Sequence, residues 1–426
     1  MTNSKNDNAW SQIFEKFKII ETIQSDGFAN ITATEINEFR EARLMTKFDY
    51  RSQLPQLFSE NNLSILPTSR GGYVISTFDT FCDFTKSEIE TKKIEFPTFL
   101  ESLDYRNITS EATAINCVFV SKILNDFTGE KILFPTVSGR MSSSSFNFNI
   151  NSTTGNRKIN VENAQVEIDG GYEGDNSLNL IEAKNSISDD FLIRQLYYPF
   201  KLWSEKISKR VRPIFLTYTN GIFHLREYCF EDPNHYNSLK LLQEKKYVVY
   251  DSVINIETIQ KILINIEFEK EPEVPFPQAD NFDRVINLCE LLNQKGFISK
   301  EEVTQNYDFD ARQTDYYTNA GKYLGLIDIR NENNQIVCLL TEKGKKLFNL
   351  SLFERQLEFV KLILSHLVFK KSLQLWFEIG EIPNKYRIVE IMKESQIYNV
   401  ATDNTYFRRA STISGWLNWI LKQIED

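Results

Sequence analysis

Two acidic residues and a lysine in the middle of the chain have types and a spacing that would let them act together in one site. The apolar alternation of 165–172 leads to Asp169 before a glycine pair, and 178–185 carries Glu182 and Lys184. Successive side chains of a strand point to opposite faces, so Glu182 and Lys184 share one face. A hairpin that joins the two strands would bring Asp169 beside Glu182.

These residue types indicate metal-assisted hydrolysis. Two carboxylates in one site repel each other unless a hard cation lies between them, and ligation by oxygen alone suits Mg2+. A lysine beside them can position or activate water and offset the charge of a phosphate. The two strands therefore predict Mg2+-assisted attack of water on a phosphodiester. The alternative is a solvated acidic hairpin without catalytic function.

The series Asp169…Glu182-Ala183-Lys184 resembles the motif of the PD-(D/E)xK nuclease superfamily, with Ile168 in the place of the motif's proline. The resemblance implies an α/β restriction-endonuclease-like core, a mixed sheet flanked by helices. It implies that Asp169, Glu182 and Lys184 are catalytic, and that Asp169, Glu182 and Ala183 bind Mg2+. Together with appended winged helices, the resemblance covers most of residues 96–350.

Three further polar residues fit the same superfamily. Glu111 opens the preceding helix, where an additional acidic residue commonly approaches the metal, and Gln195 lies in the following helix, where a glutamine often supports the active site. Glu167 shares a strand face with Asp169 and is a candidate extra ligand. Each of the three also has an interpretation without a catalytic role. Glu111 could be a first-turn glutamate that the helix dipole favours, and Gln195 and Glu167 could be polar surface residues.

A mixed α/β domain over residues 96–265 must position these side chains. Helices are predicted at 110–127 and 191–207. Strands are predicted at 132–134, 146–150, 164–169, 178–183 and 212–218.

The other segments predict a chain of several domains, as its 426 residues also indicate. They are an N-terminal accessory domain (1–95) for which DNA binding is one interpretation, a proline-interrupted linker (266–279), a winged-helix domain (280–350) and a C-terminal helical or winged-helix-like domain (351–426). The winged helix is predicted from three helices followed by a hairpin at 328–340 whose turn lies in 331–334.

Specific cleavage needs base-reading elements, because contacts to phosphates carry no sequence information. The third helix of a winged helix normally enters the major groove. Winged helices also mediate protein contacts, which is the alternative interpretation of these modules. For the serine-containing segment 134–145, the alternative to DNA contact is a flexible linker. Trp416 and Trp419 are expected to lie in a hydrophobic core. The predicted DNA-binding residues are Ser138, Arg140, Ser142, Arg312, Gln313, Tyr316, Asn319, Arg408 and Arg409.

Charge and composition exclude several classes of protein. A net charge of −9 argues against indiscriminate coating of nucleic acid, although an acidic band at 161–190 lies between basic bands at 131–160 and 191–212. Five scattered cysteines without a Cys-x-x-Cys pair argue against a zinc site or a disulfide framework and favour a reducing cytoplasm. No stretch approaches the roughly 20 apolar residues of a membrane helix, and the polar start is not a signal peptide.

The leading hypothesis is a Type II restriction endonuclease that uses Mg2+ and cuts double-stranded DNA at a short sequence. A homodimer would cut both strands with one site per chain, and a cognate methyltransferase would protect the host functionally. Three alternatives remain open: a nuclease that requires modified, methylated DNA, a non-catalytic winged-helix DNA-binding regulator, and a protein-interaction scaffold.

Overall fold

The computed structural model describes residues 4–85, 88–249, 254–306, 311–332 and 335–424. The chain divides into two compact units. The first unit comprises Met1–Pro97, Glu111–Tyr218 and Ile222–Val248. The second unit comprises Thr98–Ser110, Thr219–Gly221 and Val249–Asp426.

The first unit combines short N-terminal helices with most of the strands. Its elements are α1 (Lys5–Phe17), α2 (Ile19–Asp26), β1 (Ala29–Thr32), α3 (Ala33–Asn37), α4 (Ala42–Met45), the 3-10 helix η1 (Arg51–Gln53), α5 (Gln56–Glu60), β2 (Ser64–Pro67), β3 (Gly72–Ser76), β4 (Phe81–Asp83), β5 (Thr91–Ile94), α6 (Glu111–Val120), α7 (Ile123–Thr128), β6 (Phe134–Ser142), β7 (Phe146–Ile150), β8 (Arg157–Val161), β9 (Gln165–Glu173), β10 (Ser177–Lys184), β11 (Asp190–Leu192), α8 (Arg194–Ser204), β12 (Arg210–Thr219), β13 (Ile222–Phe230) and β14 (Leu239–Val249).

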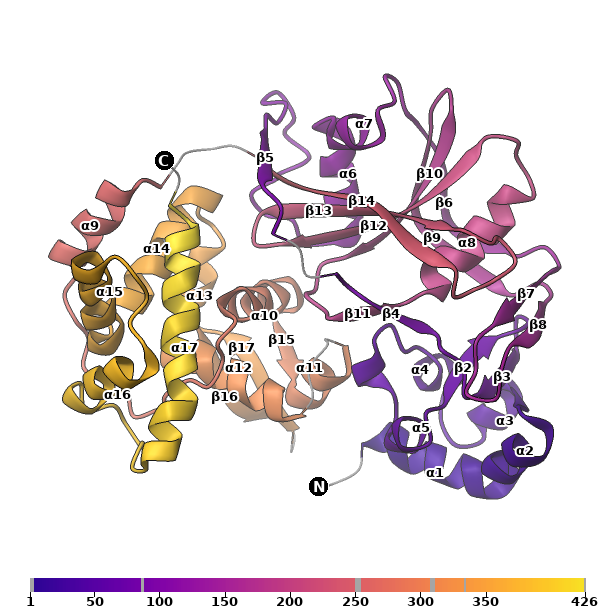
Figure 1. Cartoon of the computed structure of the whole chain (residues 1–426), viewed down its shortest axis with the longest axis horizontal. Helices are drawn as coiled ribbons and strands as arrows, with labels where there is room; N and C mark the ends of the chain where they lie inside the picture. The colour runs from indigo at the N-terminus through magenta and orange to yellow at the C-terminus, as the bar shows by residue number, and fades with distance from the viewer. Residues whose placement is uncertain (1–3, 86–87, 250–253, 307–310, 333–334, 425–426) are drawn as a thin grey trace. The chain divides into compact units, whose positions relative to one another are not determined.

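A mixed sheet forms the centre of this unit, in the order β5-β14-β13-β12-β10-β9-β6 (Figure 1). β10 runs parallel to β12 and antiparallel to β9, and helices α6 and α8 pack against β9 and β10. β10 is buried from Ser177 to Ala183, which explains why it reads as an apolar run. The expected α/β core, a mixed sheet flanked by helices, is confirmed.

The N-terminal segment belongs to the same compact unit as the sheet. Its helices α1–α5 and a small sheet in the order β1-β3-β2 surround a core that includes Trp10 and Phe58, both fully buried. Leu192, beyond the central strand β10 in the chain, packs into this core. Strand β4 also pairs antiparallel with β11. The N-terminal segment is therefore attached to the chain that directly follows β10.

Three predicted elements differ from the structure. The helix expected at 110–127 is broken into α6 and α7 because Lys122 takes a left-handed conformation, with φ of 62°. The helix expected at 191–207 begins only at Arg194, because the residues before it pair with β4 as strand β11. The segment 134–145, for which a flexible linker was the alternative, is mostly the edge strand β6.

The second unit is mainly helical. Its elements are α9 (Ile256–Asn265), α10 (Phe282–Lys295), β15 (Phe297–Ser299), α11 (Lys300–Asn306), α12 (Ala311–Tyr323), β16 (Ile327–Glu332), β17 (Gln335–Leu340), α13 (Glu342–Leu347), α14 (Leu352–Leu364), α15 (Leu367–Ile379), α16 (Lys385–Glu394) and α17 (Asp403–Lys422).

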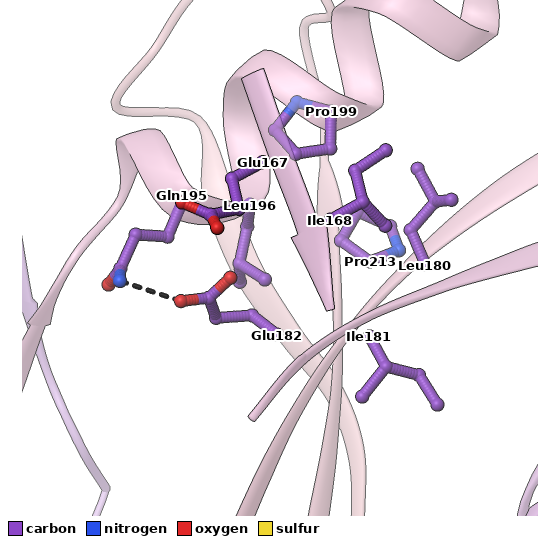
Figure 2. Close-up of a pocket in the computed structure, with 9 residues that line it drawn as sticks. All are labelled: Glu167, Ile168, Leu180, Ile181, Glu182, Gln195, Leu196, Pro199 and Pro213. Carbon is purple, nitrogen blue, oxygen red and sulfur yellow. Dashed lines mark hydrogen bonds between the residues drawn. The ribbon is translucent and has the colours of Figure 1, made fainter. Parts of the chain in front are cut away.

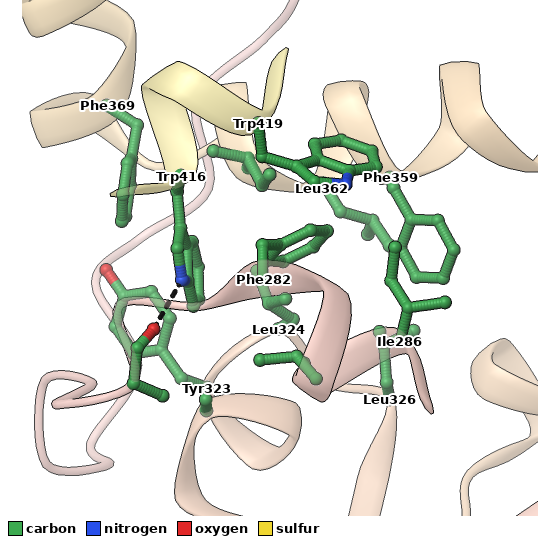
Figure 3. Packing of buried hydrophobic residues seen from close by; sticks show 14 of the residues in the cluster. Phe282, Ile286, Tyr323, Leu324, Leu326, Phe359, Leu362, Phe369, Trp416 and Trp419 are labelled. Atoms are coloured by element: carbon green, nitrogen blue, oxygen red, sulfur yellow. Dashed lines mark hydrogen bonds between the residues drawn. The ribbon is translucent and has the colours of Figure 1, made fainter. Parts of the chain in front are cut away.

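The expected hairpin after three helices is confirmed, since β16 and β17 pair antiparallel and β15 adds a third strand. Of its predicted turn, Asn331 and Glu332 belong to β16, and 333–334 lie outside the described residues. One continuous core connects α10 and α12 with α14, α15 and α17 (Figure 3). Trp416 and Trp419 are 0% and 4% exposed in it, as expected of core residues, and the Trp416 indole donates to the Ala279 carbonyl at 2.7 Å.

Gly415 permits the close approach of α17 to the chain before α10. A Cβ added there would lie 2.0 Å from the carbonyl oxygen of Asp280. Gly415→Ala is therefore expected to destabilise the protein by about 2 kcal/mol or more, because a backbone atom cannot move aside as a side chain can. Urea denaturation measures this. Gly71→Ala, whose Cβ would meet only the Ala33 Cβ at 3.9 Å, is the control, and equal stability of the two variants would contradict the prediction.

No helix in the described ranges is both long and apolar enough to cross a membrane. The five cysteines are all free thiols.

Candidate active site

The hairpin predicted from the sequence is present and brings Asp169 to the end of β10. β9 and β10 pair antiparallel, with Gly170 opposite Ile181. The residue before Gly170 is Asp169, and its Oδ2 accepts a hydrogen bond of 2.9 Å from the backbone N–H of Ala183 on β10. Asp169 is thus fixed against the backbone between Glu182 and Lys184.

A bulge in β9 sets the direction of the Asp169 side chain. Two residues of β9, Asp169 and Gly170, lie opposite the single residue Ser138 of β6. Bulges bend a strand, re-aim side chains and are frequent beside active sites. The next residue, Gly171, is packed so closely that an added Cβ would lie 2.7 Å from the Val137 Cβ. Gly171 is therefore required by packing against β6, and a Cβ on Gly170 would meet Ile115 of α6 at 3.2 Å.

Glu182, Lys184 and Gln195 form one hydrogen-bonded group. The Lys184 ammonium donates to the Glu182 Oε1 at 2.5 Å, which confirms that these two side chains share a face of β10. Gln195, in the first turn of α8, donates its Nε2–H to the same oxygen at 2.7 Å. Figure 2 shows Gln195 reaching toward Glu182 beside a small pocket, which is lined by Glu167, Ile168, Leu180, Ile181, Glu182, Gln195, Leu196, Pro199 and Pro213.

The carboxyl groups of this site resist ionisation. Burial raises the pKa of Glu182 to about 8, with repulsion from Asp169 adding to the effect and Lys184 opposing it. Burial likewise raises the pKa of Asp169, against the charge of Lys184 and the Ala183 N–H. The pKa of Glu111 is raised by burial and by repulsion from Asp169 and Asp49. A positive charge brought into the site would relieve this cost.

Lys184 is the positive centre of the cluster. Burial opposes its charge, yet Glu182, Asp49 and Glu111 together hold the pKa of Lys184 well above its ordinary value. Its side chain is only 12% exposed. Lys184 therefore remains an ammonium ion among the acidic side chains of the cluster. The structure brings together all five predicted residues, Asp169, Glu182, Lys184, Glu111 and Gln195.

Asp49 is an acidic residue of this cluster that the sequence reasoning missed. It lies between α4 and η1, and its Oδ1 accepts a long hydrogen bond of 3.4 Å from Gln195 Nε2. Its charge also acts on Glu182 and Lys184. No local pattern around Asp49 signals this, because its position depends on the packing of the N-terminal segment against the chain that follows β10.

In the described part of the chain, no group of three or more histidine, cysteine, aspartate or glutamate side chains is arranged so that it could hold a metal ion. The donors gathered at the end of β10 are carboxylate, amide and backbone oxygens, which suit a hard cation such as Mg2+. One of them, the Gln195 Oε1, is buried and has no hydrogen-bond partner in the structure. The chemistry of the donor set fits Mg2+, with Asp169 and Glu182 supplying the charge.

Glu167 lines the pocket beside Glu182 and Gln195 and its charge acts on Asp169, whereas the other predicted residues lie on β6 and in the second unit. Glu167 is exposed and its Oε1 accepts from the Arg140 Nε at 3.0 Å, across the β9–β6 pair. Ser138 and Ser142 are exposed on β6. In the second unit, α12 carries the exposed Arg312 and the half-buried Gln313, Tyr316 and Asn319, and α17 carries the exposed Arg408 and the half-buried Arg409.

Three family models match successive parts of the chain, and each is described as a domain of unknown function. DUF6996 matches residues 7–75, DUF6997 matches 76–248 and DUF7226 matches 284–425. No curated protein and no solved structure matches the chain. The candidate site combines residues from two of the matched regions, since Asp49 lies in the first and Asp169, Glu182, Lys184, Glu111 and Gln195 lie in the second.

Proposed function

We propose that this protein is a Mg2+-dependent endonuclease of the PD-(D/E)xK kind that hydrolyses double-stranded DNA at specific sequences, as a Type II restriction enzyme does. The observation that carries the proposal is the group at the end of β10. Asp169, Glu182 and Glu111 lie around one buried lysine, and all three have a raised pKa. Groups so placed are costly for stability and are typical of functional sites.

The residues of the chain have separate roles in this proposal. Asp169 and Glu182, with the backbone carbonyl of Ala183, would hold Mg2+, which when bound supplies a Lewis acid and lowers the pKa of a water molecule. Lys184 offsets the charge of the scissile phosphate and orients the attacking water. Gln195 holds the Glu182 carboxylate in position through its 2.7 Å hydrogen bond.

The edge strand β6 offers contacts to the DNA backbone near this group. Ser138 lies opposite the bulge that carries Asp169. Arg140 is 53% exposed, and its ion pair with Glu167 is exposed on both sides. Such a pair stabilises the fold by only about 0–1 kcal/mol, so Arg140 can exchange it for a phosphate at little cost.

The second unit would supply base recognition. The order α10, β15, α11, α12, β16, β17 is that of a winged helix, and α12 would then be the helix that enters the major groove. It presents Arg312, Gln313, Tyr316 and Asn319, while Arg408 and Arg409 lie on α17. A homodimer would provide two sites for the two strands. A cytoplasmic location and a cognate methyltransferase in the host complete the proposal.

The test is incubation of unmethylated and methylated plasmid DNA with the purified protein, with Mg2+ and with EDTA. We expect discrete fragments from one of the two DNA samples in Mg2+ and intact DNA in EDTA. Cutting only of methylated DNA would assign the protein to modification-dependent nucleases. A smear would contradict sequence specificity. Intact DNA throughout, from folded protein that binds a DNA site, would support the non-catalytic regulator instead.

A further inference from the structure

The amide of Gln195 lies between two carboxylates that belong to different parts of the chain. Its Nε2 is 2.7 Å from the Oε1 of Glu182 on β10 and 3.4 Å from the Oδ1 of Asp49 in the N-terminal segment. A primary amide has two N–H donors on its nitrogen and only acceptors on its oxygen. Both donors of Gln195 are therefore directed at acidic oxygens.

This arrangement fixes which end of the amide faces the cluster. A rotation by 180° about the last side-chain bond of Gln195 would set its Oε1 against the Glu182 Oε1, which already accepts a hydrogen bond from Lys184, and against the Asp49 Oδ1, so that acceptors would face acceptors. The observed orientation instead leaves the Oε1 as a buried acceptor without a partner. A buried acceptor of this kind costs free energy unless a ligand or water satisfies it.

Asp49 is itself held firmly by its neighbours in sequence and in space. Its backbone N–H donates to the Gln53 Oε1 at 2.7 Å, and its carbonyl accepts from the Leu192 N–H at 3.0 Å. The Asp49 side chain is 14% exposed. Its position therefore does not depend on the hydrogen bond to Gln195.

The two residues after Asp49 strengthen this attachment. The Tyr50 hydroxyl and the Ser186 hydroxyl are 2.8 Å apart, with Tyr50 only 2% exposed. Arg51 donates its backbone N–H to the Asp190 Oδ1 at 3.0 Å and pairs its guanidinium with the same carboxylate at 2.9 Å. Three consecutive residues of the N-terminal segment thus contact the chain between β10 and α8.

We propose that Asp49 is a positioning residue of the active site, which orients the Gln195 amide so that its oxygen is presented as an acceptor to the attacking water. The inference rests on the proposed nuclease function for the identity of that water. It makes the N-terminal segment part of the catalytic unit, because Asp49 lies in the matched region 7–75 and Gln195 in the matched region 76–248. Asp49 acts through Gln195 and does not need to contact DNA.

The experiment is a double-mutant cycle of Asp49→Ala, Gln195→Ala and the double variant, in the full-length protein. We expect Asp49→Ala to lower the kcat of Mg2+-dependent cleavage roughly 10- to 100-fold with KM unchanged, as for other residues that orient active-site groups. Added to Gln195→Ala, the same change should have little further effect, because the group that it orients is gone. Asp49→Asn retains an acceptor oxygen and should restore most of the activity.

The four proteins of the cycle, including the wild type, also give a measurement that is independent of cleavage, the melting temperature Tm. Asp49→Ala should lower Tm by about 2 to 4 °C in the wild-type background and by less in Gln195→Ala. Asp26→Ala, at an exposed aspartate of the same segment, is the matched control and should change neither quantity. If no variant cuts DNA, the nuclease proposal fails and the Tm cycle still tests the Asp49–Gln195 contact. Independent effects of the two changes on kcat and Tm, or an Asp49→Asn variant as slow as Asp49→Ala, would overturn the inference.

Discussion

Asp169→Ala is expected to reduce Mg2+-dependent DNA cleavage by about 10³-fold or more, because a lost metal ligand removes several kcal/mol of transition-state stabilisation. Asp169 is anchored by the Ala183 N–H at 2.9 Å beside Glu182 and Lys184. Gel analysis of plasmid cleavage under single-turnover conditions measures the loss. DNA binding, measured in Ca2+ by mobility shift, should be retained, because base and phosphate contacts lie on other elements.

The thermal stability of this variant should not fall with its activity. Burial and repulsion from Glu167 and Asp49 raise the pKa of Asp169, so its ionised form is disfavoured in the folded protein. Its removal should leave Tm unchanged or raised, the usual signature of a functional residue that costs stability. Asp175→Ala, at an exposed position of the same hairpin, should cut at the wild-type rate. Wild-type cleavage by Asp169→Ala would exclude the proposed catalytic site.

Glu227→Ala is expected to destabilise the protein by about 3–5 kcal/mol, because it removes one partner of a buried ion pair and leaves a buried charge uncompensated. Glu227 is 2% exposed. Its carboxylate binds the Arg212 guanidinium at 2.6 and 2.9 Å, and it also accepts from Arg210 and Gln243 at 2.8 Å. The side chains of Arg212 and Glu227 are 9% and 3% exposed, so water cannot replace the lost carboxylate.

Urea denaturation measures the effect, with Glu231→Ala as the matched control. Glu231 forms an ion pair with Lys240 in which both side chains are 61% exposed, so its loss should change stability by no more than about 0.5 kcal/mol. A loss below about 1 kcal/mol in Glu227→Ala would show that the fold tolerates an unpaired Arg212.

The same ion pair predicts a dependence of stability on pH. Burial alone would raise the pKa of Glu227, but the hydrogen bond and charge of Arg212 outweigh it and hold the pKa below its ordinary value. The stabilisation by this pair is therefore complete above the ordinary glutamate pKa and is lost as the pH falls through the lower pKa of the folded state.

Local regularities of the sequence were sufficient to predict much of the candidate site. The period of two along a strand placed Glu182 and Lys184 on one face, and the 2.5 Å contact between them agrees. The apolar runs and the glycines between them predicted the β9–β10 hairpin that delivers Asp169. Each of these inferences concerns residues near one another in the chain, where backbone geometry alone limits the arrangements.

Only the tertiary structure placed Asp49 in the cluster. Its approach depends on the pairing of β4 with β11 and on the contacts of Tyr50 and Arg51 with residues beyond β10. The start of α8 and the bulge at Asp169 were decided in the same way, by partners on β4 and β6. Such contacts form because distant segments bury apolar surface and satisfy polar groups together, and no short pattern in one segment records the partner that it meets.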